Sequence, residues 1–237
     1  MSTRENADWF GREDAFAFLE RDRDNRLRLE RVEAFLARRA KGQPGARLLD
    51  VGAGDGRVGE RFARLGYRVT ALDAAPKNAE RARERGLEAV VGDASEPLPF
   101  ARAEFDVVYA GELIEHLFDT QGFLSELARV TKRGGTVVVT TPNLAHLPDR
   151  LRLLLGRTPT QTQPLHPYLK LHIRPFTRPS LEASLRSVGL EPTACESTLV
   201  VWRRDPRDPD RVVAASRWLA RAFPGLGSFL IVYATRS

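Results

Sequence analysis

The sequence predicts an α/β protein in which helices cover both faces of a mostly parallel sheet. Short apolar runs alternate with amphipathic helical runs from residue 47 to residue 140, and this alternation is typical of a strand–helix–strand chain. The apolar runs have the composition of strands that are buried on both faces. Two more strand-like runs follow near the C-terminus. We therefore expect a doubly wound, Rossmann-like sheet of about seven strands.

A helical extension precedes the first strand. Residues 13–39 are expected to form helix in one or two pieces, because Leu29, Val32 and Leu36 follow the three- and four-residue spacing of an apolar stripe. The glycine- and proline-containing turn at residues 42–45 ends it. Residues 1–45 thus form an N-terminal helical extension.

The expected core covers residues 46–143 and holds five short strands. They are residues 47–51, 67–72, 87–91, 105–110 and 136–140. Each helix between them has one apolar face. One of these helices begins at Pro76, a residue that is favoured at the first helical position, and stops at Gly86.

The regular alternation stops after the fifth strand. Residues 144–178, rich in proline, histidine and arginine, are expected to be an insertion. The C-terminal part, residues 179–237, contains a helix at 179–188 and strands at 190–201 and 228–235. A helical insertion near 208–223 separates these two strands. Periodicity leaves the direction of the last strands open.

Composition limits the class of protein. The chain is 42% hydrophobic, and no apolar run has the length of about 18 residues that a membrane-spanning helix needs. Because the first residues lack the apolar stretch of a secretion signal, we expect a cytoplasmic protein without membrane insertion. The single cysteine, Cys195, leaves no internal disulfide and no thiolate metal site. The net charge is +6, but acidic and basic residues alternate along the helices. This pattern is typical of a solvated surface, so we do not expect nucleic acid as a partner.

Three alternate glycines follow the first strand. Gly52 suits a tight turn, Gly54 allows the backbone to approach a ligand, and Gly56 allows the next helix to pack closely. The strand-to-helix context makes this a ligand loop rather than a simple corner. Arg57 occupies the third glycine position of the dinucleotide pattern G-x-G-x-x-G, so a nicotinamide cofactor fits less well.

Residues 47–143 resemble the class I S-adenosylmethionine-dependent methyltransferases of the small-molecule type. The resemblance depends on four segments in register, at residues 50–56, at Asp73, at residues 92–94 and at residues 110–116. It implies that Asp73 accepts hydrogen bonds from the ribose hydroxyls and that the Asp93 segment contacts the adenine. The implied residues for S-adenosylmethionine, and for the product S-adenosylhomocysteine, are Asp50, Gly52, Ala53, Gly54, Asp73, Ala74, Asp93, Ala94, Gly111 and Glu112.

Structural interpretations of the same side chains stay open. Asp73 could cap the helix that begins at Pro76, and Asp93 could form an Asx turn before Ser95. His116, in the segment that resembles the family's E-x-x-E-H motif, is either a packed histidine or a group near the reacting methyl. Glu115 is interpreted as a structural acceptor rather than a base.

The insertion is a second candidate region. Residues 144–178 contain six Lys and Arg but one acid, Asp149, together with His146, His166 and His172. The insertion leaves the carboxyl end of the fifth strand, where ligands bind in doubly wound folds. A cationic rim there predicts an anionic acceptor held by His172 and Arg174, although a solvated basic loop is the alternative. No metal is expected, because His146 and His166 lie 20 residues apart and we identify no acidic partner at ligand spacing near the histidines.

The predicted function is methyl transfer to a small, anionic metabolite, with oxygen favoured over nitrogen as the acceptor atom. His116 and His172 are the candidate bases for a hydroxyl acceptor. The alternatives are methylation of RNA or another nucleic acid, and a non-catalytic cofactor-binding subunit. The Asn/Asp-Pro-Pro-Tyr/Phe segment of base amino methyltransferases is missing after the fourth strand. The oligomeric state is left open.

Overall fold

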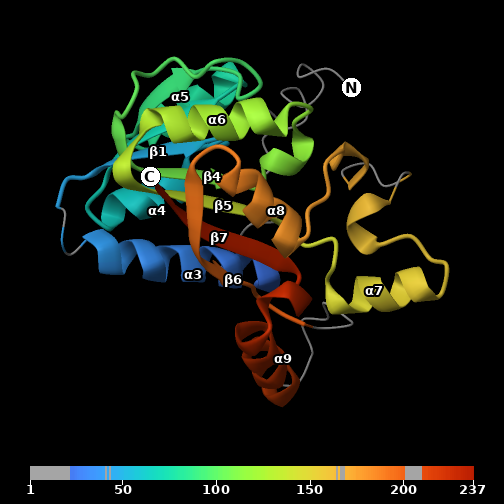
Figure 1. The fold of residues 1–237 in the computed structure, drawn as a ribbon. Helices are drawn as coiled ribbons and strands as arrows, with labels where there is room; N and C mark the ends of the chain where they lie inside the picture. The colour runs from blue at the N-terminus through green and yellow to red at the C-terminus, as the bar shows by residue number, and fades with distance from the viewer. Residues whose placement is uncertain (1–21, 41, 43, 164, 166–168, 201–209) are drawn as a thin grey trace.

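A single sheet organises the computed structural model, which describes residues 22–40, 42, 44–163, 165, 169–200 and 210–237. Within these residues the sheet has seven strands in the order β3-β2-β1-β4-β5-β7-β6 (Figure 1). The strands are β1 Arg47–Val51, β2 Arg68–Asp73, β3 Glu88–Val91, β4 Phe105–Gly111, β5 Thr131–Pro142, β6 Leu190–Glu196 and β7 Phe229–Arg236. The predicted fold class is confirmed.

The last strand settles the direction that periodicity left open. β7 runs antiparallel to β5, with register pairs from Thr136 with Thr235 to Pro142 with Phe229. It also runs antiparallel to β6 on its other side. The remaining pairs, β1 with β2, β1 with β4, β2 with β3 and β4 with β5, are parallel.

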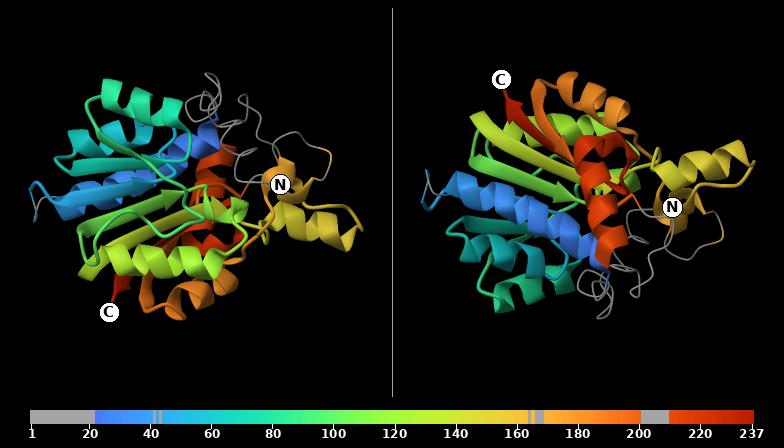
Figure 2. Two further views of the ribbon diagram at one scale, coloured as in Figure 1. Left: turned by 90° about the horizontal axis from the view of Figure 1, so that it is seen from above. Right: turned by 90° about the horizontal axis from the view of Figure 1, so that it is seen from below.

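Helices cover both faces of the sheet (Figure 2). They are α3 Arg23–Ala40, α4 Arg57–Arg64, α5 Pro76–Glu84, α6 Thr120–Val130, α7 Leu147–Leu154, α8 Arg178–Arg186 and α9 Asp210–Ala222. Short 3-10 helices occupy η1 Ile114–His116, η2 Thr160–Thr162, η3 Leu169–Leu171 and η4 Pro224–Leu226. Among the described helices, none is long and apolar enough to cross a membrane.

Two hydrophobic cores result from the alternation of side chains along each strand. On one face, Leu124 of α6 and Leu181 of α8 pack with Leu49 of β1. On the other face, the apolar stripe of α3, including Val32, packs with Phe62 of α4 against the sheet. The chain order reverses between β1 and β4, so their carboxyl ends open the crevice where ligands bind in this architecture.

Three parts of the prediction differ from the structure. β6 ends at Glu196, and residues 197–200, which we expected to continue this strand, have no regular secondary structure. The insertion contains a helix that periodicity did not show, α7, with Pro148 in its first turn. β5 begins at Thr131 rather than Thr136. The first part of the expected N-terminal helix, residues 13–21, lies outside the described residues, as do residue 201 and residues 208–209.

Candidate active site

The glycine loop has the backbone conformation that its sequence requires. Gly52, Gly54 and Gly56 have φ values of 73°, 56° and 81°, a region that side chains other than glycine rarely adopt. A Cβ atom at Gly52 would lie 3.0 Å from the side chain of Leu113. At Gly56 it would lie 2.8 Å from the Cα atom of Ala82 in α5, so the close approach at this glycine is to α5, whereas we expected the following helix, α4, to approach the strand there. A side chain at either position would therefore collide with the protein, so only glycine allows this glycine cradle, residues 52–56.

Asp73 organises the loop at the end of β2. Its Oδ2 accepts from the Gly54 N–H at 2.8 Å, and its Oδ1 accepts from the Ala75 N–H at 2.9 Å and from the Asn78 side chain at 3.0 Å. The N-cap of α5 is Ala75, which makes no side-chain cap, so the capping interpretation of Asp73 is wrong. The carboxylate is fixed in orientation beside the glycine loop, which fits the ribose contact that the family resemblance implies.

Asp93 forms the Asx turn that was one interpretation of its sequence context. Its Oδ1 accepts from the Ser95 N–H at 2.8 Å. Ala94 next to it is buried. Asp93 follows β3, and the turn uses only one of its two carboxylate oxygens. A contact between the other oxygen and the adenine stays a prediction.

Asp50 is a buried carboxyl beneath the glycine loop. Its Oδ2 has no hydrogen-bond partner among the described residues. Burial and the nearby Asp73 raise its pKa to about 7. This oxygen faces Gly59 of α4, where a Cβ atom would lie 3.3 Å from it, so it is enclosed between the helix and the sheet.

The raised pKa gives a test by protein stability. Folded Asp50 keeps, up to about pH 7, a proton that the unfolded chain releases near the ordinary value of 3.8. The free energy of unfolding should therefore fall as pH rises from about 4 to about 7, and Asp50→Asn should flatten this dependence by up to ~1.4 kcal/mol per pH unit. Urea unfolding across this range measures it.

Asp106 provides a control of opposite sign. Its burial is opposed by Lys132 and by the Arg47 N–H, which together lower its pKa. Asp106→Asn should therefore remove stability that the wild type gains as pH rises. Equal slopes for Asp50→Asn and the wild type would contradict the assignment of the buried proton to Asp50.

Beyond β4, a buried polar network surrounds Glu112. Glu112 has a φ of 55°, and its Oε1 accepts from the Thr140 hydroxyl at 2.9 Å. Arg28 of α3 donates to the Tyr109 and Thr140 hydroxyls at 3.0 and 2.9 Å, and its Nε lies 3.7 Å from the Glu112 carboxylate. Burial raises the pKa of Glu112 to about 8, although Arg28 opposes the shift. Gly111 beside it has no room for a side chain, because a Cβ atom would collide with Tyr109.

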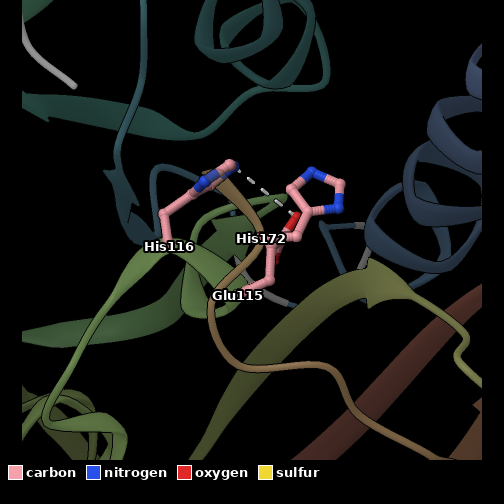
Figure 3. Close-up of side chains that lie close together, drawn as sticks. All are labelled: Glu115, His116 and His172. Carbon is pink, nitrogen blue, oxygen red and sulfur yellow. Dashed lines mark ion pairs between the residues drawn. The ribbon is translucent and has the colours of Figure 1, made fainter. Parts of the chain in front are cut away.

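The motif after β4 and the insertion meet in one cluster (Figure 3). A carboxylate oxygen of Glu115 and one ring nitrogen each from His116 and His172 lie within 4.8 Å of one another. The His116 and His172 rings pack edge to face with centroids 5.0 Å apart. The N–H groups of Ile173 and Arg174 donate to the Glu115 carbonyl at 2.9 and 3.0 Å, so backbone contacts tie the insertion to the motif.

The hydrogen bonds of the two rings assign their protons. His116 Nδ1 lies 3.1 Å from the Leu171 carbonyl oxygen, and His172 Nδ1 lies 3.2 Å from the Gln161 carbonyl oxygen. Because a carbonyl only accepts, each Nδ1 carries the hydrogen, and in the neutral ring Nε2 holds the lone pair. Burial lowers the pKa of His116 to about 4, so this ring is neutral at physiological pH.

Glu115 supplies the acidic member of this cluster. Its Oε2 accepts from the Thr141 hydroxyl at 2.9 Å, as a structural acceptor would, whereas its Oε1 has no hydrogen-bond partner among the described residues. Burial raises its pKa to about 7. Two histidines and a carboxylate are also a ligand set that zinc accepts.

One premise of the sequence analysis is therefore wrong. We expected no acidic partner near the histidines, yet Glu115 lies beside His116 and His172, and His146 Nδ1 lies 3.7 Å from Asp149. The spacing argument missed Glu115 because 57 positions of sequence separate it from His172 (172 − 115). His166 lies outside the described residues.

Arg174 occupies the rim rather than the cluster. The residue is exposed. Its guanidinium stacks over the Phe118 ring at 5.5 Å, and Nε donates to the Phe118 carbonyl at 3.3 Å. Phe118 is itself exposed. The structure thus brings His116 and His172 together and leaves Arg174 outside the cluster, on an exposed segment.

Arg28 is a member of the buried polar network around Glu112 that we did not expect from the sequence. It lies four positions before Val32, on the apolar stripe of α3, and its side chain is 2% exposed. An arginine on an apolar helix face was the available signal, since a buried cation requires polar partners.

Known methyltransferases are similar to this chain over the same segments. A family model described as "Methyltransferase domain" matches residues 49–139. The ubiquinone biosynthesis O-methyltransferase of Caulobacter sp. (strain K31) is 39% identical over 142 residues, which are 56% of this chain and half the length of that relative. The relative of the same name from Xanthomonas campestris pv. campestris (strain B100) is 34% identical over 174 residues, 70% of each chain.

A solved structure supports the same fold. The S-adenosylmethionine dependent methyltransferase from Mesorhizobium loti superposes with a TM-score of 0.59 at 19% identity, covering 88% of this chain and all of that one. The glycine cradle, the ordered Asp73 carboxylate and these similarities agree. The chain belongs to the class I S-adenosylmethionine-dependent methyltransferases.

Proposed function

We propose that the protein transfers the methyl group of S-adenosylmethionine to a hydroxyl oxygen of a small, anionic molecule. The observation that carries the proposal is the buried cluster of Glu115, His116 and His172, which gathers hydrogen-bond acceptors next to the cofactor loops. A hydroxyl group is a donor that such a cluster can hold. Both relatives described above are O-methyltransferases, which favours oxygen as the acceptor atom.

The residues supply position and proton acceptance. When bound, S-adenosylmethionine supplies an electrophilic methyl group on a sulfonium, and displacement needs the acceptor oxygen about 3 to 3.5 Å away and in line. The neutral His116 ring offers its Nε2 lone pair to the acceptor hydroxyl and takes the proton as the oxygen becomes nucleophilic. His172 and Glu115 fix the hydroxyl from the neighbouring directions. Burial of the cluster keeps water from competing.

Arg174 is proposed to hold the negative charge of the acceptor. Its guanidinium can bind a carboxylate or phosphate with two parallel hydrogen bonds, and its exposed position against Phe118 leaves it accessible to an entering molecule. Arg174→Ala should raise KM for the acceptor about tenfold and leave cofactor affinity unchanged. Arg186→Ala, which removes an exposed arginine of α8, is the control and should change neither constant.

The proposed methyl transfer takes place without a metal ion. A sulfonium needs no Lewis acid, so dialysis against EDTA should leave the rate unchanged. Loss of activity that Zn²⁺ or Mn²⁺ restores would instead show that Glu115, His116 and His172 bind a cation. The rate before and after dialysis, with metal content measured by mass spectrometry, separates the two outcomes.

The direct experiment is an acceptor screen. Protein and S-adenosylmethionine are incubated with hydroxyl-bearing aromatic acids and matched amines, and S-adenosylhomocysteine is measured by mass spectrometry. Turnover on hydroxyl acceptors, in preference to amines, supports the proposal. Preferred methylation of RNA, or cofactor binding without turnover on any acceptor, would contradict it. The cytoplasmic location expected from the sequence belongs to the same proposal.

A further inference from the structure

The insertion contains a helix with an unusual distribution of apolar side chains. α7 extends away from the sheet in each view (Figures 1 and 2). Leu151, Leu154 and Leu155 are 40, 82 and 66% exposed. Their spacing of three and four positions places them on one side of the helix, so they form an apolar stripe that faces outward instead of into a core. Leu153, which is 54% exposed, lies on the other side of the helix and does not belong to this stripe.

The base of α7 is fixed to the protein, so its outward stripe has a defined orientation. Asp149 is fully buried and accepts from the Thr160 N–H at 2.8 Å and from the Thr160 hydroxyl. Arg150 donates to the carbonyl oxygens of Ala145 and Gly225 at 2.6 and 3.0 Å. Pro148 in the first turn is buried. The leucine stripe is therefore a property of a packed element and not of a loose loop.

Cationic side chains border the leucine stripe. At 100° per residue, Arg150 and Arg152 lie on opposite sides of it. Arg157 follows in an exposed turn after Gly156. The insertion's single acid, Asp149, is buried, accepts from Thr160 and lies 3.8 Å from Arg152 Nε, so α7 has no exposed carboxylate and keeps a net positive charge. Exposed leucines between arginines are complementary to a surface that is apolar inside and anionic at its boundary.

We propose that α7 docks the protein on an anionic lipid bilayer, with Leu151, Leu154 and Leu155 entering the interface and Arg157 contacting lipid phosphates. Arg150 and Arg152, whose guanidinium groups donate to backbone carbonyls of the insertion and of Gly225, add positive charge at the boundary. A bilayer suits this surface better than a protein partner does. The stripe is short and lies on a projecting helix, whereas a stable protein interface needs about 800 Å² from each partner. The inference concerns binding alone and does not depend on the methyl acceptor.

Vesicle flotation tests the proposal with the full chain. The protein should float with vesicles of phosphatidylcholine and phosphatidylglycerol, and less with phosphatidylcholine alone. The triple variant Leu151→Gln, Leu154→Gln and Leu155→Gln should lower the partition coefficient about tenfold or more. Because the three side chains are exposed, the variant should keep the wild-type Tm. Trp218→Gln, which removes an exposed aromatic side chain from α9, is the matched control and should bind as the wild type does.

A charge variant examines the other half of the surface. Arg157→Glu should weaken binding to the anionic vesicles severalfold and reduce its salt dependence. Arg133→Glu makes the same change of charge at an exposed position near the amino end of β5. This variant should bind the vesicles as the wild type does.

Three results would overturn the proposal. They are absence of vesicle binding by the wild type, an equal loss of binding in Trp218→Gln and the leucine variant, and a leucine-dependent dimer in light scattering without vesicle binding. The last result would assign α7 to contact between copies of the chain. Cofactor affinity, measured on the same samples, should be unchanged in all variants, so a failure here leaves the proposed methyl transfer untouched.

Discussion

Replacing Asp73 with alanine is expected to weaken binding of S-adenosylhomocysteine by ~1 to 3 kcal/mol, which corresponds to about five- to 150-fold in Kd. The variant loses the carboxylate that we assign to the ribose hydroxyls. It also frees the Gly54 N–H, which Asp73 holds at 2.8 Å. Both effects weaken binding, because the glycine loop no longer has one preferred arrangement. Isothermal titration calorimetry measures the change.

A carboxylate at the amino ends of the strands, away from the glycine loop, serves as the control. Asp106 accepts from the Arg47 N–H at 2.9 Å and from Lys132 at 2.7 Å, near the amino ends of β1 and β4. Asp106→Ala should leave cofactor affinity unchanged even where it lowers Tm. If Asp73→Ala binds the cofactor product as tightly as the wild type while folded, the ribose assignment is wrong.

The second large effect is expected on turnover. His116→Asn should lower kcat by about 10² to 10⁴ on a hydroxyl acceptor, because the asparagine amide can keep the hydrogen bond to the Leu171 carbonyl but has no group at the position of Nε2. Cofactor affinity should stay the same. Steady-state kinetics together with calorimetry separate the two constants.

The same substitution distinguishes the packed histidine from the base. A histidine that only fills space and bonds to Leu171 predicts nearly wild-type kcat for His116→Asn, since that contact is retained. His116→Gln reaches toward the Nε2 position but carries no basic nitrogen, so it should also be slow. Because burial lowers the pKa of His116 to about 4, the wild-type rate should show no titration of this ring near its ordinary pKa of 6.5.

Local sequence signals were sufficient for several elements of the core, although not for the start of β5 or the direction of β7. β1 was predicted with the observed bounds, because an apolar run lay between a glycine turn and the glycine loop. α5 was predicted from Pro76 and Gly86, and it ends two residues before that glycine. In both cases the residues that begin and end the element are close in sequence, so their signals do not depend on tertiary contacts.

Tertiary contacts decide the parts that were missed. α7 has its apolar stripe exposed and its acid buried, so its pattern resembles that of an irregular basic segment. Arg28 reaches Thr140 across 112 positions, and Glu115 meets His172 only because the insertion returns to the end of β5, where Phe176 pairs with Asn143. No spacing rule covers contacts of this range. The cofactor loops, in contrast, follow from a family pattern that is local to each strand end.

The position of β7 has a consequence for biogenesis. β7 follows every other strand in the sequence yet lies between β5 and β6, so β6 has no partner until β7 has been synthesised and has entered the sheet. During translation the growing polypeptide exposes the unpaired edges of both neighbours, and pairing of such distant segments is slow. The ribosome-bound intermediate is therefore the species most prone to self-association, and chaperone dependence should concentrate in that interval.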